Sequence, residues 1–348
     1  MKQNYLLLIL LLITVNILLF VTNLVIGTVN IPLKAIIGIV GGIPTLLKEF
    51  SEGELTIWQN IIFSSRMPQT ITAMFAGSGL AVSGLQMQTV FRNPLAGPSV
   101  LGVSNGASLG VAFVVLLSNS IGGIVLSRLG YIGDVAITVA AIIGSLAVLG
   151  LIILVAQYVR GNVTLLLIGV MTGYLANAII GVLKFFSPEE DVKAYVVWGL
   201  GCFSQTSGTQ LLVFAILICI LLPSSMLLIK TMNMLLLGDN YARNLGLDIR
   251  HSRMAVIVSS GLLAAVVTAY CGPIMFIGLA VPHLVRSLFR TSDHRILMPS
   301  TLVCGSGLAL TCNVLARLPG FEGALPVNSV TALVGAPIIA SVLIRKKG

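Results

Sequence analysis

The sequence predicts an all-α polytopic membrane protein with about ten transmembrane helices. Of its 348 residues, 57% are hydrophobic and only 9% are charged, whereas charged residues make up about a quarter of a soluble globular chain. A membrane-spanning helix needs roughly 20 apolar residues, so at about 35 residues per helix and loop the chain supplies about ten spans. No sizeable soluble domain fits beside them, and we expect residues 1–348 to form a single transmembrane domain.

Ten apolar runs follow one another along the chain, separated by polar, glycine-rich or proline-rich breaks. They lie at residues 5–27, 67–89, 95–117, 134–157, 163–186, 209–229, 253–271, 274–290, 296–315 and 327–344. The first run follows a single charge, Lys2, and no cleavage site of small residues comes after it, which favours a membrane helix over a signal peptide. Residues 31–50 carry two prolines and two lysines, and we expect an interfacial helix or a re-entrant stretch there.

Positive charge divides unevenly between the two sides of this topology. With the N-terminus inside, thirteen of the 20 lysines and arginines fall in cytoplasmic loops and seven fall outside, as the positive-inside rule requires. An even number of spans places both termini in the cytoplasm. The net charge of +9 therefore indicates orientation in a lipid membrane and not binding to nucleic acid.

Several kinds of chemistry are disfavoured by the motifs. The spans carry almost no charge, which argues against an ion-driven pump. There is no G-x-x-x-x-G-K-[ST] motif, so a phosphate-binding P-loop is absent. The five cysteines lack a CxxC pair, the three histidines are widely scattered, and neither set indicates a metal site. Energy for uphill transport must therefore come from an ion gradient or from a separate ATP-hydrolysing subunit.

One short pattern raises an enzymatic alternative. Residues 102–106 match the G-x-S-x-G nucleophile motif, with Ser104 as nucleophile and His283 as base of an intramembrane serine protease. The pattern is short, and both residue types are common in this chain. Spacing of four between Gly102, Gly106 and Gly110 equally predicts close packing against a neighbouring helix.

Two polar segments are candidates for function. In the cytoplasmic loop 230–253, Asp239 can cap a short helix and Gly246 can end it, which gives either a protein-docking element or an ordinary solvated loop. In residues 91–98, two prolines interrupt the helix, and Asn93 and Leu95 project from the break. This break forms either a gate or a tight turn.

These segments resemble the permease subunits of bacterial iron-siderophore, haem and cobalamin ABC importers, the FecCD-type permeases with the type II ABC importer permease fold. The resemblance covers essentially the whole chain. The shared motifs are GSGLAVSG at 77–84 with Gln88, RNPLA at 92–96, LGVSNGA at 101–107, LLLIGV at 165–170, LGDNYARNLG at 237–246, GPI at 272–274, FIGL at 276–279, VPHLVR at 281–286 and DHR at 293–295.

The resemblance implies a ten-helix, non-catalytic permease subunit that binds no cofactor itself. Its implied partners are a second permease subunit, two ATPase subunits that bind ATP and Mg²⁺, and an external substrate-binding protein. It implies a cytoplasmic gate at Asn93 and Leu95, with a second constriction at Asn162 and Val163. The ATPase-coupling residues it implies are Gly238, Asp239, Ala242, Arg243, Leu245 and Gly246, and the residues that dock the binding protein are Arg66 and Arg317. The expected cargo is an iron chelate (siderophore or haem) or cobalamin, moved by alternating access.

Four positions depart from the family pattern, in or near the outward-facing end. Gln69 stands where the family has a second docking arginine, Asn313 where it has Asp, Ala324 where it has Glu and Asn328 where it has Gly. These losses lead to the hypothesis that the second permease is a non-identical paralogue that retains the missing charges. The alternative function is an ion-coupled secondary transporter or a channel that acts alone.

Overall fold

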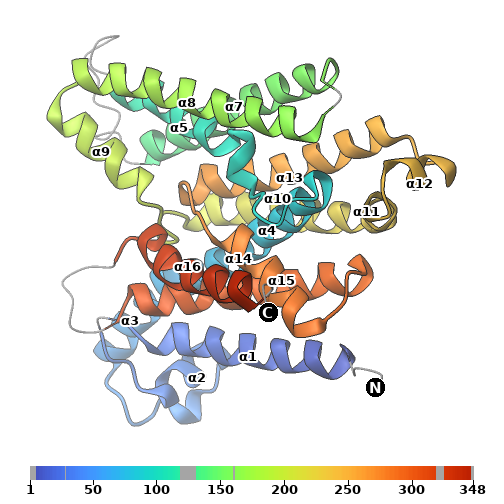
Figure 1. Cartoon of the computed structure of the whole chain (residues 1–348). Helices are drawn as coiled ribbons and strands as arrows, with labels where there is room; N and C mark the ends of the chain where they lie inside the picture. The colour runs from blue at the N-terminus through green and yellow to red at the C-terminus, as the bar shows by residue number, and fades with distance from the viewer. Residues whose placement is uncertain (1–4, 28, 118–130, 160, 319–324, 346–348) are drawn as a thin grey trace.

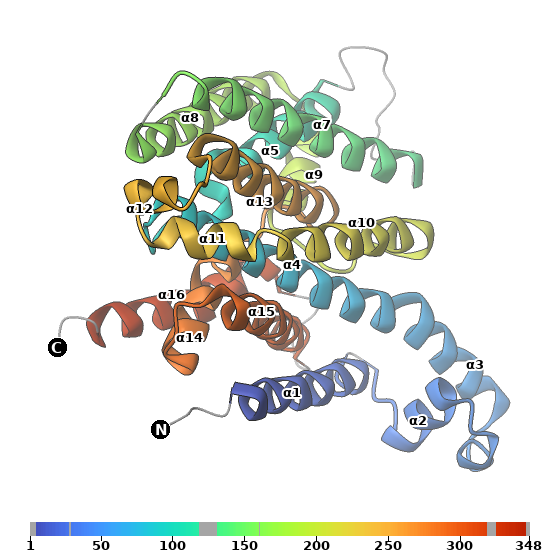
Figure 2. The same cartoon turned by 90° about the vertical axis from the view of Figure 1, so that its right-hand side faces the viewer.

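Helix α4 (Met67–Phe91) lies in the middle of the molecule and is buried along most of its length. Helices α15 (His294–Ala316) and α14 (Ile277–Phe289) pack against one side of it, and α13 (Ile249–Cys271) and α10 (Gly208–Met226) pack against another (Figure 2). The α4 sequence suits this position because small and short polar residues occur all round the helix. It presents no single apolar face, as expected of a helix enclosed by protein.

Further helices form layers outside this central group (Figure 1). Helix α1 (Tyr5–Val25) packs on α15, and α16 (Val327–Arg345) packs on α14 and α15. On the opposite side, α5 (Val103–Leu116) packs on α7 (Tyr131–Ala156) and on α8 (Asn162–Phe186). The order from one face to the other is α8 and α7, then α5 and α13, then α4, then α15, then α1.

The ten helices above coincide with the ten predicted spans. The computed structural model describes residues 5–27, 29–117, 131–159, 161–318 and 325–345, and in these ranges it contains helices and no strands. Six of the described helices are long and apolar enough to cross a membrane, namely α1, α7, α8, α10, α13 and α15. Helices α5, α14 and α16 are shorter and apolar. The predicted class, an all-α polytopic membrane protein, is confirmed.

The glycines at spacing of four hold α5 against α7. A Cβ atom on Gly106 would lie 2.5 Å from the Gly144 carbonyl oxygen, and one on Gly110 would lie 2.1 Å from that of Ala140. Neither position has room for a side chain. The predicted close packing of this glycine stripe is therefore confirmed, and it lets the two backbones approach each other.

Short helices occupy the segments between spans. In the stretch predicted to be interfacial or re-entrant, α2 (Leu33–Gly41) is followed by the 3₁₀ turn η1 (Pro44–Leu46). Helix α3 (Glu52–Ile61) then begins with a capping box in which Ser51 and Glu54 bond each other's backbone. Helix α9 (Glu189–Gly199) was not predicted. Its acidic first turn is typical of a helix start, but no apolar periodicity of spanning length marks it.

Candidate cytoplasmic coupling site and gate loop

The candidate coupling helix is α12 (Asp239–Asn244), which follows α11 (Ile229–Leu236). The sequence assigned the N-cap to Asp239, but the structure places Gly238 there and makes Asp239 the first helical residue. Gly238 has a φ of +105°, which only glycine adopts without strain. The Asp239 carboxylate is consequently free to face two arginines instead of capping its own helix.

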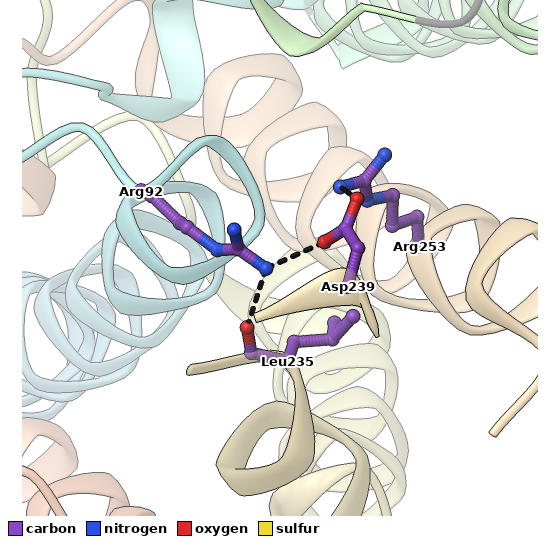
Figure 3. A network of polar contacts seen from close by, with 4 residues as sticks. All are labelled: Arg92, Leu235, Asp239 and Arg253. Carbon is purple, nitrogen blue, oxygen red and sulfur yellow. Dashed lines mark hydrogen bonds and ion pairs between the residues drawn. The ribbon is translucent and has the colours of Figure 1, made fainter. Parts of the chain in front are cut away.

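Asp239 on α12 forms ion pairs with two arginines, one at the end of α4 and one on α13 (Figure 3). Arg92, at the end of α4, donates from Nη2 to Asp239 Oδ1 at 2.5 Å and to the Leu235 carbonyl oxygen at 2.9 Å. Arg253 on α13 donates from Nη2 to Asp239 Oδ2 at 2.6 Å. Each ion pair is partly exposed and adds only about 0.2–1 kcal/mol to stability. Their main effect is geometric, because they tie α12 to the last turn of α4 and to α13.

Three large apolar side chains are exposed on α12 and at its two ends. Ala242 is fully buried and anchors the helix. The side chains of Leu237, Tyr241 and Leu245 are 59%, 69% and 59% exposed. The sequence indicated Leu245 as a coupling residue but not Leu237 or Tyr241. The spacing of four between these three residues could have indicated that they lie on one side of a helix. Clustered exposed apolar residues beside charged ones are typical of a protein-docking surface.

The gate loop lies directly after Arg92, which ends α4 in the left-handed conformation with a φ of 46°. Asn93 Oδ1 accepts a hydrogen bond of 2.9 Å from the Leu95 N–H, forming a tight local turn. His283 on α14 donates from Nε2 to the Pro94 carbonyl oxygen at 2.7 Å. The loop thus forms a tight turn and is also hydrogen-bonded to α14 through His283. Its Leu95 side chain remains 49% exposed.

The second predicted constriction begins α8. Val163, its second residue, is 72% exposed. The side chain of Asn162 lies outside the described residues. The gate role of all four residues, Asn93, Leu95, Asn162 and Val163, stays a prediction.

A second set of bonds ties the last turn of α4 to α15 and α11. Asn233 on α11 donates from Nδ2 to the Asp293 carboxylate at 2.7 Å, so its Oδ1 is the atom that accepts from His294 Nδ1 at 2.8 Å. The other ring nitrogen of His294, Nε2, forms a hydrogen bond of 2.8 Å with the Thr89 hydroxyl of α4. His294 is 1% exposed, and no sequence pattern signalled this buried relay.

Asp293 orients Asn233, the first side chain of this relay. It caps α15 by accepting from the Arg295 N–H at 2.9 Å, and that bond lowers the pKa of its carboxyl from the usual value. The carboxylate is therefore ionised at neutral pH and holds Asn233 in one orientation. Helix α11, which leads into the coupling helix, is thereby fixed to α15 and through His294 to α4.

The two arginines predicted to dock the binding protein lie elsewhere, next to the end of α1. Arg66 is only 3% exposed and donates to the carbonyl oxygens of Leu24, Val25 and Val29. All of its contacts are within the chain. Its guanidinium is therefore engaged inside the chain, and the docking role of Arg66 stays a prediction.

Arg317 is half-buried and also bonds within the chain. It donates from Nη1 to Gln69 Oε1 at 3.1 Å and from Nη2 to Asn23 Oδ1 at 3.0 Å. Its partners are neutral, so its charge is not cancelled by a carboxylate among the described residues. The docking role of Arg317 stays a prediction.

The protease alternative finds no support in the site geometry. Ser104 Oγ lies 3.3 Å from Thr268 Oγ1, and His283 Nε2 bonds the Pro94 carbonyl oxygen, so each of the two proposed catalytic residues has a non-catalytic partner. Among the described residues there is also no group of three His, Cys, Asp or Glu side chains that could hold a metal ion.

Comparison with known proteins gives consistent matches over nearly the whole chain. The model of the FecCD transport family matches residues 11–345. The hemin transport system permease protein HmuU of Yersinia pestis is 35% identical over 295 residues, covering 84% of each chain. The vitamin B12 import system permease protein BtuC of Klebsiella pneumoniae is 35% identical over 301 residues, covering 86% of this chain and 85% of BtuC.

A solved structure agrees with these sequence matches. A metal-chelate type ABC transporter in an inward-facing conformation superposes with a TM-score of 0.82 and 27% sequence identity. The match covers 97% of this chain and 99% of the other. The ten-helix arrangement described above is therefore one that a known transporter adopts from end to end.

Proposed function

The chain belongs to the FecCD transport family, and we propose that it carries an iron chelate or cobalamin across the bacterial cytoplasmic membrane as the permease subunit of an ABC importer. The similarity to hemin and vitamin B12 permeases supports a bulky, ring-shaped or chelated metal compound as cargo. The nearly uncharged helices suit such a cargo, because a wall without fixed charges lets it pass without binding it tightly.

The Arg92–Asp239–Arg253 bridge is the observation that carries the mechanism. It connects the exposed coupling helix α12 to the residue directly before the gate loop. When ATP closes two partner ATPase subunits, displacement of α12 would be transmitted to Arg92 and then to Asn93 and Leu95. Alternating access then opens and closes the gate without ATP or Mg²⁺ binding to this chain, which is a transport subunit and not an enzyme.

The same arrangement supports a topology and a set of partners. The start of α1 and helix α12 lie toward the same end of the bundle, at the right of Figure 1. With α12 facing the ATPase, the N-terminus is cytoplasmic, and the ten spans return the C-terminus to that side. A single permease domain of this kind would pair with a second permease, two ATPase subunits and an external binding protein.

The exposed face of α12 gives a direct test of the proposal. Tyr241→Glu places a charge in the apolar patch, and we expect it to weaken binding of the ATPase subunit in a copurification assay. Tyr158→Glu is the matched control, because Tyr158 is also exposed, at 85%, and lies outside α12. Equal ATPase binding by the Tyr241→Glu variant and the unaltered protein would contradict the proposal.

A further inference from the structure

A basic cleft lies beside the coupling helix, on the side that faces α13 and the turn between α7 and α8. It encloses about 450 Å³. Three arginines line it, Arg243 on α12 with Arg250 and Arg253 on α13, and Asp239 is the one acidic residue in the lining. The feature is separate from the gate loop.

The charges in the cleft are not balanced. The Asp239 carboxylate is already shared by Arg92 and Arg253. Arg243 forms no ion pair with any described residue, and Arg250 donates from Nη2 to a neutral acceptor, the Gln157 carbonyl oxygen, at 3.2 Å. Arg253 Nε is buried without a hydrogen-bond partner among the described residues. Guanidinium groups whose N–H donors lack an anionic partner commonly bind phosphate in proteins.

The rest of the cleft is apolar and lies at the end of three spans. Its wall includes Val90, Leu165 and Ile257. Helix α7 ends at Ala156, α8 starts at Asn162 and α13 starts at Ile249, so the cleft opens where these spans reach the membrane surface. Basic pockets between helices at the cytoplasmic surface are typical sites for anionic lipid headgroups.

We propose that this cleft binds a phosphate group, carried by an anionic phospholipid of the cytoplasmic leaflet or present as free phosphate. The phosphate oxygens accept from Arg243 and Arg250, and the apolar wall contacts the glycerol and upper acyl carbons when the source is a lipid. Because Arg250 also holds Gln157 in the turn before α8, an occupied cleft braces α12 against the segment that precedes Val163.

The test uses the full-length chain in a neutral detergent, with phosphatidylglycerol, phosphatidylcholine or inorganic phosphate added in turn. We expect phosphatidylglycerol to raise the thermal unfolding temperature more than phosphatidylcholine does. In Arg250→Gln the apparent affinity for phosphatidylglycerol should fall about tenfold, the effect of losing one charge-assisted hydrogen bond. Arg295→Gln is the matched control, an exposed arginine near the start of α15 that does not line the cleft.

The outcomes separate the two phosphate sources. A response to phosphatidylglycerol alone identifies a lipid headgroup, and an additional response to inorganic phosphate above that of equimolar chloride identifies a site open to soluble phosphate. Native mass spectrometry of retained phosphatidylglycerol provides a second readout if Arg250→Gln is unstable, and Arg250→Lys should restore part of the binding. The proposal is overturned if both lipids act equally, if Arg250→Gln keeps the full response, or if Arg250→Gln impairs only binding of the ATPase subunit.

Discussion

Gln69 on α4 donates a hydrogen bond of 3.1 Å from Nε2 to Asn313 Oδ1 on α15. Asn313 in turn donates to Asn23 Oδ1 at 2.8 Å, and Arg317 donates to both Gln69 and Asn23. Gln69 and Asn313 are two of the four positions that depart from the family pattern. They are in contact, so an amide pair stands where the resemblance led us to expect an arginine and an aspartate.

This contact bears on the interpretation of the departures. The sequence suggested that the missing charges are supplied by a non-identical second permease. Gln69 and Asn313 are hydrogen-bonded to each other within this chain, and the hypothesis of a non-identical second permease stays a prediction. Asn328 also has an internal partner, since its Oδ1 accepts from the Met275 N–H at 3.1 Å. Ala324 lies outside the described residues.

The first prediction concerns this amide network. Gln69→Leu leaves Asn313 and Arg317 without one partner each at a buried site, and we expect a loss of about 1–3 kcal/mol in unfolding free energy. Thermal or denaturant unfolding of the purified protein in detergent measures it. Gln59→Leu on α3 is the matched control, since Gln59 is exposed. A double change of Gln69 and Asn313 to Leu should cost less than the sum of the single changes, and strict additivity would contradict the network.

The second prediction concerns coupling. Asp239→Asn removes the charge that Arg92 and Arg253 share, and we expect ATP-driven uptake to fall about three- to tenfold, equivalent to roughly 0.7–1.4 kcal/mol for a partly exposed network. The measurement is uptake per reconstituted complex, with complex assembly checked separately. Asp248→Asn is the control, because Asp248 caps α13 and Asn is an equally good cap. Unchanged uptake in Asp239→Asn would show that the bridge does not transmit motion.

The third prediction concerns the buried relay at His294. His294→Leu removes the side-chain bonds to Asn233 and Thr89 and leaves the bond from the backbone N–H of residue 294 to Asn233 in place. We expect it to destabilise the protein by about 1–3 kcal/mol, because buried polar partners lose their bonds. Hydrogen exchange should also show faster opening of the last turn of α4, where Thr89 loses its bond to α15. The same stability and exchange as in the unaltered protein would rule out this role.

The fourth prediction tests the packing of α4 on α14. A Cβ atom on Gly84 would lie 1.7 Å from the Gly278 carbonyl oxygen, which is backbone and cannot move aside. Gly84→Ala should therefore prevent accumulation of folded protein in the membrane. Gly150→Ala is the control, because no atom lies within 4 Å of the added methyl group there. Normal expression and folding of Gly84→Ala would show that this crossing is wrong.

Local patterns in the sequence were enough to predict the helices, six of which are long and apolar enough to cross a membrane. Each of the ten runs contains a helix because hydrophobic length is a local property, and the glycine stripe of α5 packed as its spacing indicated. The run predicted at 95–117 is a helix only from Val103, because the 3₁₀ turn η3 (Pro98–Leu101) precedes it. The position of the coupling helix followed from its own residues in the same way. The prediction that Asp239 is its N-cap was wrong. The Asp239 carboxylate bonds the distant Arg92 and Arg253 instead of the first turn of its own helix.

Contacts between distant segments could not be predicted in this way. Arg92 and Asp239 are 147 positions apart, and Thr89 and His294 are 205 apart. The sequence placed Arg66 in an outer loop but gave no sign that its side chain is buried against carbonyl groups at the end of α1. Such partners depend on how helices are arranged in three dimensions, which charge counting along a chain does not reveal.

Reconstituted uptake tests the central claim most directly. The chain is incorporated into proteoliposomes with its partner permease, the ATPase subunits and a loaded binding protein, and uptake of the bound compound is followed with and without ATP. The account predicts uptake that requires ATP hydrolysis and the ATPase, with none driven by a proton or sodium gradient alone. Uptake by the permease without the ATPase, driven by either gradient, would contradict it and favour a secondary transporter or channel.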